Sequence, residues 1–259
     1  MLYKYTNWLI ALGLAMSLLA CTDHRLGGAL SPAQLRLKTI TGSLNNTYSY
    51  DSQNRLATIA KPTGGLVVFA YDDVRKYAEY KQYDNAADQT SGTRITFPYS
   101  FPNQDFSTTI YTFSSTIPNY YNPVDEVRYT VDPLLPSHLR SVTRYFMSTQ
   151  RDVRVYDYRG DNITKGTFST GRISLGDKAY EYDDKINPFF GSTDPDLDDI
   201  QRFSRNNVVK ITSSYPPIAG GYADQVVTYQ YEYNQQGLPT KRTTTQGGTD
   251  ITSYVYESY

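Results

Sequence analysis

Apolar and polar residues alternate along much of the chain, and this pattern predicts β-strands. The clearest case is residues 227–233, where every second position is Val or Tyr and the positions between them are Thr, Gln and Glu. Such a strand buries one face and exposes the other, as in an antiparallel sheet that has water on one side. We therefore expect residues 224–233 to be a strand of such a sheet.

Short polar turns separate the alternating segments. Residues 51–54 and 235–237 are two such turns, made of Asp, Asn, Ser, Gln and Gly. About fourteen candidate strands follow one another at intervals of roughly 8–12 residues, a spacing typical of β-meanders, sandwiches and barrels. Because short turns favour pairing between sequence neighbours, the pattern predicts an all-β antiparallel meander.

The alternation stops between residues 187 and 205. Asp194 is expected to be the N-cap of a short helix, with Pro195 at its first position. The apolar face of this helix would consist of Leu197, Ile200 and Phe203. We expect one short helix inserted in the meander, where it would act as a lid or plug over one end of the curved sheet.

The first twenty residues have the features of a signal peptide. Lys4 provides a positive start, and residues 8–20 are an apolar run shorter than the roughly 20 residues of a membrane-spanning helix. Residues 18–21 (Leu-Leu-Ala-Cys) resemble the lipobox of bacterial lipoproteins, which implies cleavage before Cys21 and lipidation of its thiol. The alternatives are an ordinary signal peptide and an uncleaved anchor with an incidental cysteine.

The resulting organisation has three parts. Residues 1–20 would be a lipoprotein signal peptide, residues 21–34 a flexible tether from lipidated Cys21, and residues 35–259 a single all-β domain. The chain has no polybasic segment, so the acyl chains on Cys21 would hold it at the membrane. We expect a lipid-anchored protein of the bacterial cell envelope, at the outer membrane.

Composition excludes some partners and supports the sheet. The net charge of −1 provides no electrostatic footprint for nucleic acid. Cys21 is the single cysteine, so the chain cannot form an internal disulfide or a thiolate metal site. Tyrosine is abundant, with 26 residues of 259, and it suits half-buried pleated surfaces.

Repeated Tyr-x-Tyr hairpins resemble a known repeat. Residues 48–56 and 231–238 are similar to units of the YD repeats of Rhs-type and teneurin-type β-shells, and residues 156–162 and 180–187 are looser versions. With the lipobox, the Asp-Lys-x-Asn-Pro-Phe segment at 184–189 and the Asn-Asn-Val at 206–208, the layout resembles a family of uncharacterised envelope lipoproteins described as porin-like. That resemblance implies a strongly curved antiparallel sheet, and we expect a half-barrel or flattened barrel.

Catalytic candidates are few. His24 lies in the tether, and His138 would have to serve a Ser-His-Asp site although the chain lacks the Gly-x-Ser-x-Gly elbow. The adjacent acidic residues Asp125 and Glu126, and likewise Asp183 and Asp184, border expected turns, where Asp is common. We expect a protein that is not an enzyme and needs no cofactor, with an envelope hydrolase as the least supported alternative.

Alternating carboxylates at Asp194, Asp196 and Asp198 suggest a calcium site, because calcium prefers oxygen ligands. An EF-hand loop would need Gly and Glu where this chain has Asp199 and Arg205. The same aspartates are explained by a helix N-terminus, so calcium is the weaker alternative.

Aromatic residues are the best candidates for a binding surface. The expected function is binding of an apolar or glycan ligand, such as a lipid, on a Tyr-rich concave sheet face. The candidate contacts are Tyr180, Tyr182, Phe189, Phe190, Tyr229, Tyr231 and Tyr233. The alternative is a structural component that docks an envelope protein partner in an outer-membrane assembly.

A transmembrane barrel is disfavoured by the sequence. Most alternating runs have about 5–8 residues, whereas membrane strands need roughly 9–11. Counting back by twos from Tyr259 also places Glu257 and Ser253 on the face that would contact lipid.

Overall fold

Sixteen antiparallel strands surround an irregular segment that carries one short helix. The computed structural model describes residues 34–42, 44–73, 77–87, 89–98, 105–113, 122–135, 137–146, 148–216, 223–245 and 249–259. Leu35–Tyr259 form one compact unit.

The strands follow one another along the chain with short connections. Their bounds are β1 (Leu35–Thr41), β2 (Thr47–Tyr50), β3 (Leu56–Ala60), β4 (Leu66–Asp72), β5 (Tyr77–Tyr83), β6 (Gly92–Pro98), β7 (Phe106–Phe113), β8 (Asn122–Val131), β9 (Leu139–Phe146), β10 (Thr149–Arg159), β11 (Asn162–Thr170), β12 (Ile173–Ile186), β13 (Asn206–Ser214), β14 (Gln225–Tyr233), β15 (Pro239–Thr245) and β16 (Thr249–Ser258). The helix α2 (Asp199–Phe203) lies between β12 and β13.

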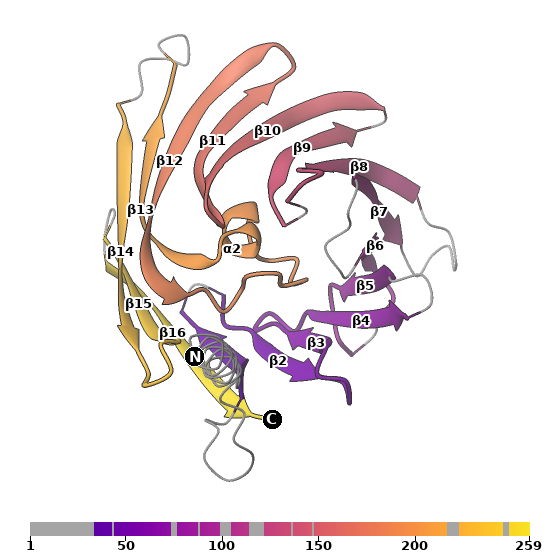
Figure 1. Cartoon of the computed structure of the whole chain (residues 1–259). Coiled ribbons are helices and arrows are strands. Elements are labelled where there is room, and N and C mark those ends of the chain that lie inside the picture. The colour runs from indigo at the N-terminus through magenta and orange to yellow at the C-terminus, as the bar shows by residue number, and fades with distance from the viewer. Residues whose placement is uncertain are drawn as a thin grey trace, which may run out of the picture. The chain divides into compact units, whose positions relative to one another are not determined.

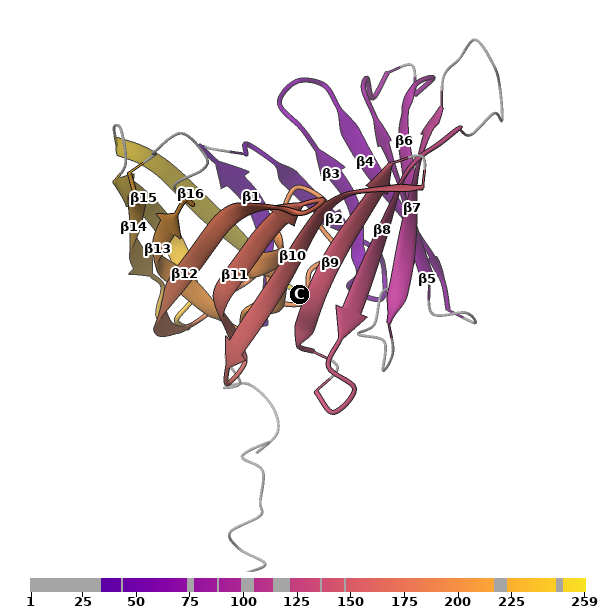
Figure 2. The same ribbon diagram turned by 90° about the horizontal axis from the view of Figure 1, so that it is seen from above.

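The sheet closes on itself. Every strand pairs with its sequence neighbours, and β1 pairs with β16 from Leu35 opposite Ser258 to Thr41 opposite Ser253. Figure 1 looks into the resulting barrel, and Figure 2 shows its slanted strands from the side. The structure is all-β and antiparallel, but the expected half-barrel or flattened barrel is wrong. Closure pairs the first strand of the domain with the last, so the sheet has no free edges. The sequence pattern did not predict this pairing, because the two strands lie at opposite ends of the domain.

Alternation along each strand separates an outer face from a buried inner face. Val155 is 47% exposed on the outside, whereas the next residue, Tyr156, is 6% exposed and points inward. Ion pairs join neighbouring strands on the outer face: Lys165 with Asp177 at 2.8 Å, Lys210 with Glu181 at 2.7 Å, and Lys241 with Glu232 at 2.7 Å. The inner faces and the enclosed segment form the hydrophobic core.

Several strands are longer than expected. β12 has 14 residues and β10 has 11, so the expectation of runs of about 5–8 residues is wrong for them. Polar residues such as Asp177 and Glu181 interrupt the apolar pattern without ending the strand, because their side chains face outward and pair with lysines. In the described part of the chain, no helix is long and apolar enough to cross a membrane.

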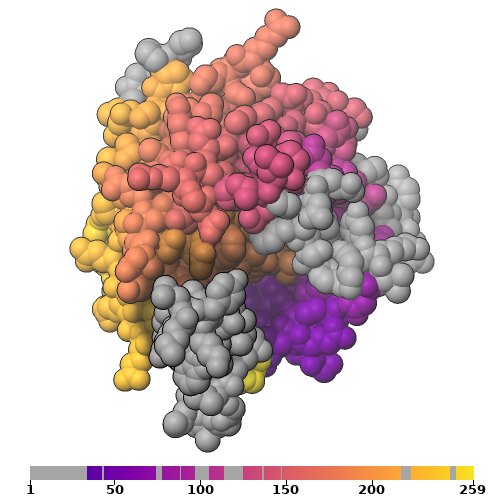
Figure 3. Space-filling model, in the orientation of Figure 1, coloured from indigo at the N-terminus to yellow at the C-terminus, as the bar shows by residue number. Residues whose placement is uncertain are grey.

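Residues 187–205, here called the plug, fill part of the barrel interior (Figure 1). In the space-filling view the orange atoms of this segment lie in a recess between the strands (Figure 3). Its apolar side chains Phe189, Leu197, Ile200 and Phe203 are at most 7% exposed. The prediction of one short inserted helix is therefore confirmed, and its segment lies inside a closed barrel instead of over one end of an open sheet.

The helix begins later than expected. Its N-cap is Asp198, whose side chain accepts from the Gln201 backbone N–H at 2.8 Å in a capping box. Asp194 as N-cap and Pro195 as the first helical residue are therefore wrong. Asp194 instead lies in a turn, where its buried carboxylate accepts the backbone N–H of Asp196 at 2.9 Å.

Candidate functional site

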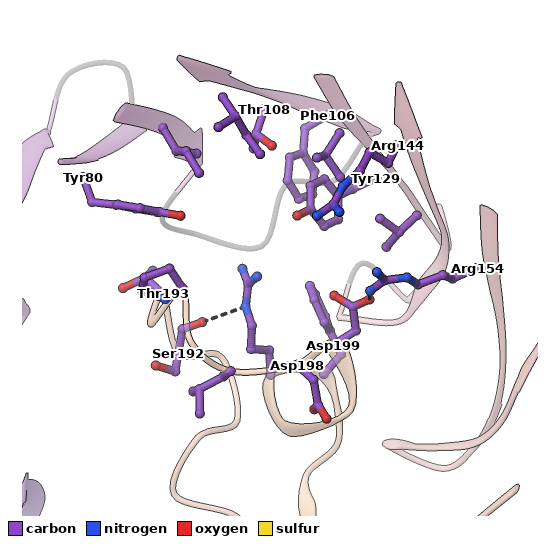
Figure 4. A pocket seen from close by; sticks show the side chains of 18 of the residues that line it. Tyr80, Phe106, Thr108, Tyr129, Arg144, Arg154, Ser192, Thr193, Asp198 and Asp199 are labelled. Atoms are coloured by element: carbon purple, nitrogen blue, oxygen red, sulfur yellow. Dashed lines mark hydrogen bonds and ion pairs between the residues drawn. The ribbon is translucent and has the colours of Figure 1, made fainter. Parts of the chain in front are cut away.

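A cavity of about 290 Å³ lies between the plug and the inner faces of β5 to β10 (Figure 4). It combines an apolar aromatic wall with a cluster of arginines and aspartates. The wall strands contribute Tyr80, Ile95, Phe106, Thr108, Ile110, Val127, Tyr129, Val142, Arg144, Asp152 and Arg154, and the plug contributes Gly191, Ser192, Thr193, Pro195, Leu197, Asp198, Asp199, Arg202 and Phe203.

The aromatic wall is built by neighbouring strands. Phe106 on β7 stands opposite Tyr129 on β8 in the ladder, and their rings stack with centroids 4.6 Å apart. Stacked rings and the adjoining aliphatic residues provide a flat apolar surface. Burial raises the pKa of Tyr129, against the opposing effect of the Arg202 guanidinium, so its hydroxyl stays protonated at neutral pH.

Part of the charged cluster is paired within the protein. The Arg154 Nη1 lies 3.1 Å from the Asp199 Oδ2, and the Tyr156 hydroxyl donates to the same oxygen at 2.6 Å. Burial, with the nearby Asp199 carboxylate, raises the pKa of Tyr156. These contacts join β10 to the plug and occupy one oxygen of Asp199.

Two other arginines of the cavity, Arg202 and Arg144, have fewer contacts with carboxylates of the protein. The Arg202 Nε donates to the Ser192 carbonyl at 3.3 Å, and no carboxylate of the described residues forms an ion pair with its guanidinium. The Arg144 Nε lies 3.9 Å from the Asp125 Oδ2, at the outer limit of an ion pair, and its side chain is 43% exposed. Figure 4 shows Arg144 beside Tyr129 and Phe106. Both guanidinium groups line the same cavity and can donate to a ligand.

One acceptor at the cavity is also unused. The Asp152 Oδ1 is buried and accepts no hydrogen bond from the described residues, since the Arg154 Nε is 3.6 Å away. Buried polar atoms are normally hydrogen-bonded, so an unsatisfied one calls for an explanation. The cavity therefore presents a ligand with spare donors, a spare acceptor and an aromatic surface.

The seven aromatic residues singled out from the sequence do not line this cavity. Phe189, Tyr229 and Tyr231 line a smaller cavity of about 170 Å³ on the other side of the plug, and Phe189 and Phe190 line an open hollow near Tyr48 and Tyr256.

Two of the remaining tyrosines of that set use their hydroxyls inside the fold, and the third is buried in the core. Tyr182 donates to the Ile163 carbonyl at 2.5 Å, and Tyr233 donates to the Asp183 carboxylate. Tyr180 is 6% exposed in the core. Whether any of the seven contacts a ligand stays a prediction, and the structure does not bring them together at one site.

The acidic pairs considered for catalysis do not converge. Asp125 lies near Arg144, whereas Glu126 pairs with Arg128 at 2.8 Å, because consecutive strand residues face opposite sides. Asp183 accepts hydrogen bonds from β13 and β14 residues, and the side chain of Asp184 is 84% exposed.

His138 packs its ring on Tyr158, with centroids 4.2 Å apart. Its Nε2 lies 3.6 Å from the Asp161 Oδ1. It lines a shallow hollow at the turns that follow β8 and β10, away from the acidic pairs.

The three aspartates of the calcium hypothesis each contact protein donors. Asp194 accepts from the Tyr48 hydroxyl at 2.8 Å, and Asp196 pairs with the Lys61 Nζ at 2.7 Å. Asp198 caps α2. Among the described residues, no group of three or more His, Cys, Asp or Glu side chains is arranged to hold a metal.

The sequence did not predict the residues of the 290 Å³ cavity between the plug and β5 to β10, here called the luminal cavity. Arg144, Asp152 and Arg154 are charged residues in the inward phase of their strands, the phase shared by Val142 and Tyr156. A charged residue in an otherwise apolar inward phase was the available signal. Cys21, His24 and the expected signal peptide and tether lie outside the described residues.

Comparison with known proteins supports the architecture. No protein-family model and no curated protein sequence matches the chain. A porin-like protein from Bacteroides uniformis ATCC 8492 has a similar solved structure, with a TM-score of 0.55 and 13% sequence identity over 87% of this chain and 98% of that chain. At this identity the likeness shows a shared fold, a closed antiparallel porin-like barrel.

Proposed function

We propose that this chain is a lipid-anchored protein of the bacterial cell envelope that binds a small ligand inside its barrel without chemical conversion. The observation that carries the proposal is the luminal cavity, whose aromatic wall, spare guanidinium donors and unsatisfied carboxylate oxygen face one another. Concave pockets with an apolar lining and a few convergent polar groups are typical of ligand sites.

The envelope location is supported by two independent features. Residues 18–21 resemble a lipobox, and the barrel has the fold of a porin-like bacterial protein. We infer attachment to the outer membrane through acyl chains on Cys21.

Paired charges on the outer face of the barrel wall favour contact with water over contact with lipid. Lys165, Asp177, Lys210 and Glu181 form ion pairs on the outer face of β11, β12 and β13. A basic residue facing lipid at the middle of the bilayer costs about 2–4 kcal/mol. A lipid-facing wall is therefore disfavoured, and the acyl chains would hold the protein at the membrane.

A glycan fits the cavity better than a purely apolar ligand. An apolar ligand would cover the Arg202 guanidinium and the Asp152 Oδ1 without offering them hydrogen bonds, and burying polar groups without hydrogen bonds is costly. Sugars present hydroxyls at their edges and apolar C–H faces that pack on aromatic rings, which matches the mixed lining.

The docking alternative has less support. An exposed edge strand would give a partner protein a ready pairing site. In the described barrel, each of the sixteen strands has a neighbour on both sides. The structure therefore favours binding inside the barrel over docking by strand addition.

Native mass spectrometry of the protein purified from its own cells tests the proposal. We expect a bound small molecule in the wild type and its loss from Val142→Phe, because this inward residue lines the cavity. Thr143→Phe on the outer face of the same strand is the matched control and should retain the ligand. A ligand kept equally by both variants, with both folded by circular dichroism, would contradict luminal binding.

A further inference from the structure

We propose that the ligand of the luminal cavity is an acidic sugar, held by its carboxylate on Arg202 and Arg144. This inference rests on the proposed luminal binding function and specifies its ligand class. It combines four properties of the cavity: its charge, its unsatisfied acceptor, its aromatic wall and its size.

The charge of the cavity favours an anion. Asp199 is occupied by Arg154 and Tyr156, and the Asp198 side chain caps α2. Arg202 lies close enough to Tyr80 and Tyr129 to oppose the rise in pKa that burial causes in both. Its guanidinium therefore stands among aromatic groups without a carboxylate from the described chain, and the loosely paired Arg144 lines the same space.

A carboxylate suits this arrangement because guanidinium groups bind planar oxyanions with two parallel hydrogen bonds. Such bonds involve charge on both sides and are stronger than neutral ones. The ligand carboxylate would supply the anion that the protein does not provide for Arg202.

The Asp152 Oδ1 requires a donor and not a second anion. It is buried and unsatisfied, and it lines the cavity together with Arg144, its partner across the β9–β10 ladder. A sugar hydroxyl donates to such an oxygen, whereas a simple fatty or aromatic acid has no hydroxyl to offer. The acceptor and the cations together suit a ligand that carries both hydroxyls and a carboxylate.

The aromatic wall and the volume fit one sugar ring. The stacked Phe106 and Tyr129 provide an apolar surface for the C–H face of a pyranose. The volume of about 290 Å³ is at the low end for small-molecule sites. It accommodates a single sugar unit and excludes a long chain.

Titration calorimetry with three small probes tests the inference. D-glucuronate carries both groups, D-glucose lacks the carboxylate, and cyclohexanecarboxylate lacks the hydroxyls. We expect the Kd for glucuronate to be at least tenfold lower than for either other probe, since each of them lacks one of the charge-assisted hydrogen bonds. Arg202→Gln should abolish the preference over glucose, and the control Arg205→Gln should keep it, because Arg205 pairs with Asp161 and does not line the cavity.

The outcomes separate this inference from the proposed function. Equal binding of glucuronate and glucose would overturn the acidic assignment, and equal binding of cyclohexanecarboxylate would overturn the sugar assignment, while luminal binding stands in both cases. If no probe binds but native mass spectrometry shows a ligand that Val142→Phe removes, the inference fails alone. If neither experiment detects binding, both fail.

Discussion

Asp194 shows how a single carboxylate is accommodated in the plug. It is 1% exposed, and its two oxygens accept the Tyr48 hydroxyl at 2.8 Å and the Asp196 backbone N–H at 2.9 Å. Burial raises the pKa of this carboxyl although both hydrogen bonds act to lower it. The folded protein therefore favours protonated Asp194 more than the unfolded chain does.

The raised pKa of Asp194 predicts that the stability of the folded protein depends on pH. The stabilisation from protonated Asp194 is fully present below the ordinary pKa of about 3.8 and is lost as the pH rises through the raised value. We expect the unfolding free energy of the wild type, relative to Asp194→Asn, to fall as the pH rises above about 4, because Asn stays neutral. Urea unfolding at several pH values measures the difference. Asp184→Asn, at an exposed site, is the control, and a pH-independent difference for Asp194→Asn would contradict the assignment.

The plug is the element that determines how the barrel is filled. On one side, Asp194 and Asp196 accept contacts from Tyr48 and Lys61, and on the other side Asp199 accepts contacts from β10. Four plug side chains are also buried against the wall. The plug therefore bridges opposite parts of the barrel and separates the luminal cavity from the smaller one.

The hydrogen bond between Tyr156 and Asp199 is the closest polar contact of the plug with β10. Tyr156→Phe should lower the unfolding free energy by about 1.5–3 kcal/mol, because it removes a donor to a charged acceptor. Tyr83→Phe on β5 is a suitable control. The Tyr83 ring packs on Phe113, and its hydroxyl donates to none of the described residues, so we expect a loss below about 0.5 kcal/mol. Equal losses from urea unfolding would mean that this hydrogen bond does not hold the plug.

At the scale of the whole molecule, the proposed lipid anchor predicts that membrane attachment depends on the N-terminus. The ion pairs of Lys165 and Lys210 lie on the outer face of the strands, where a membrane barrel would carry apolar residues. These ion pairs favour the proposed lipid anchor over a barrel embedded in the bilayer.

Replacement of Cys21 tests the mode of attachment. We expect Cys21→Ser to move the protein from the membrane fraction to the soluble fraction, while the control Thr22→Ser stays with the membrane. Fractionation of cells after a carbonate wash measures the distribution. Retention of Cys21→Ser in the washed membrane would overturn the lipid-anchor proposal.

The sequence by itself determined the local features of this protein. Alternation of period two indicated the strands, short polar turns indicated antiparallel neighbours, and the break after residue 186 indicated an insertion. These properties could be predicted because each depends on residues close together in the chain. The tyrosines were correctly expected on the sheet, but their abundance did not indicate where side chains would leave a cavity unfilled.

Tertiary structure alone decided closure, the burial of Asp194 and the candidate site. Closure depends on β1 meeting β16 across the length of the domain. The helix start is local, because the capping box joins Asp198 to Gln201, whereas the burial of Asp194 depends on its distant partner Tyr48. The luminal cavity combines Arg144 and Asp152 from adjacent strands with Arg202 from the plug. Residues this far apart in sequence become neighbours only when the chain folds, so their shared cavity, and the charge left unpaired in it, cannot be read from local patterns.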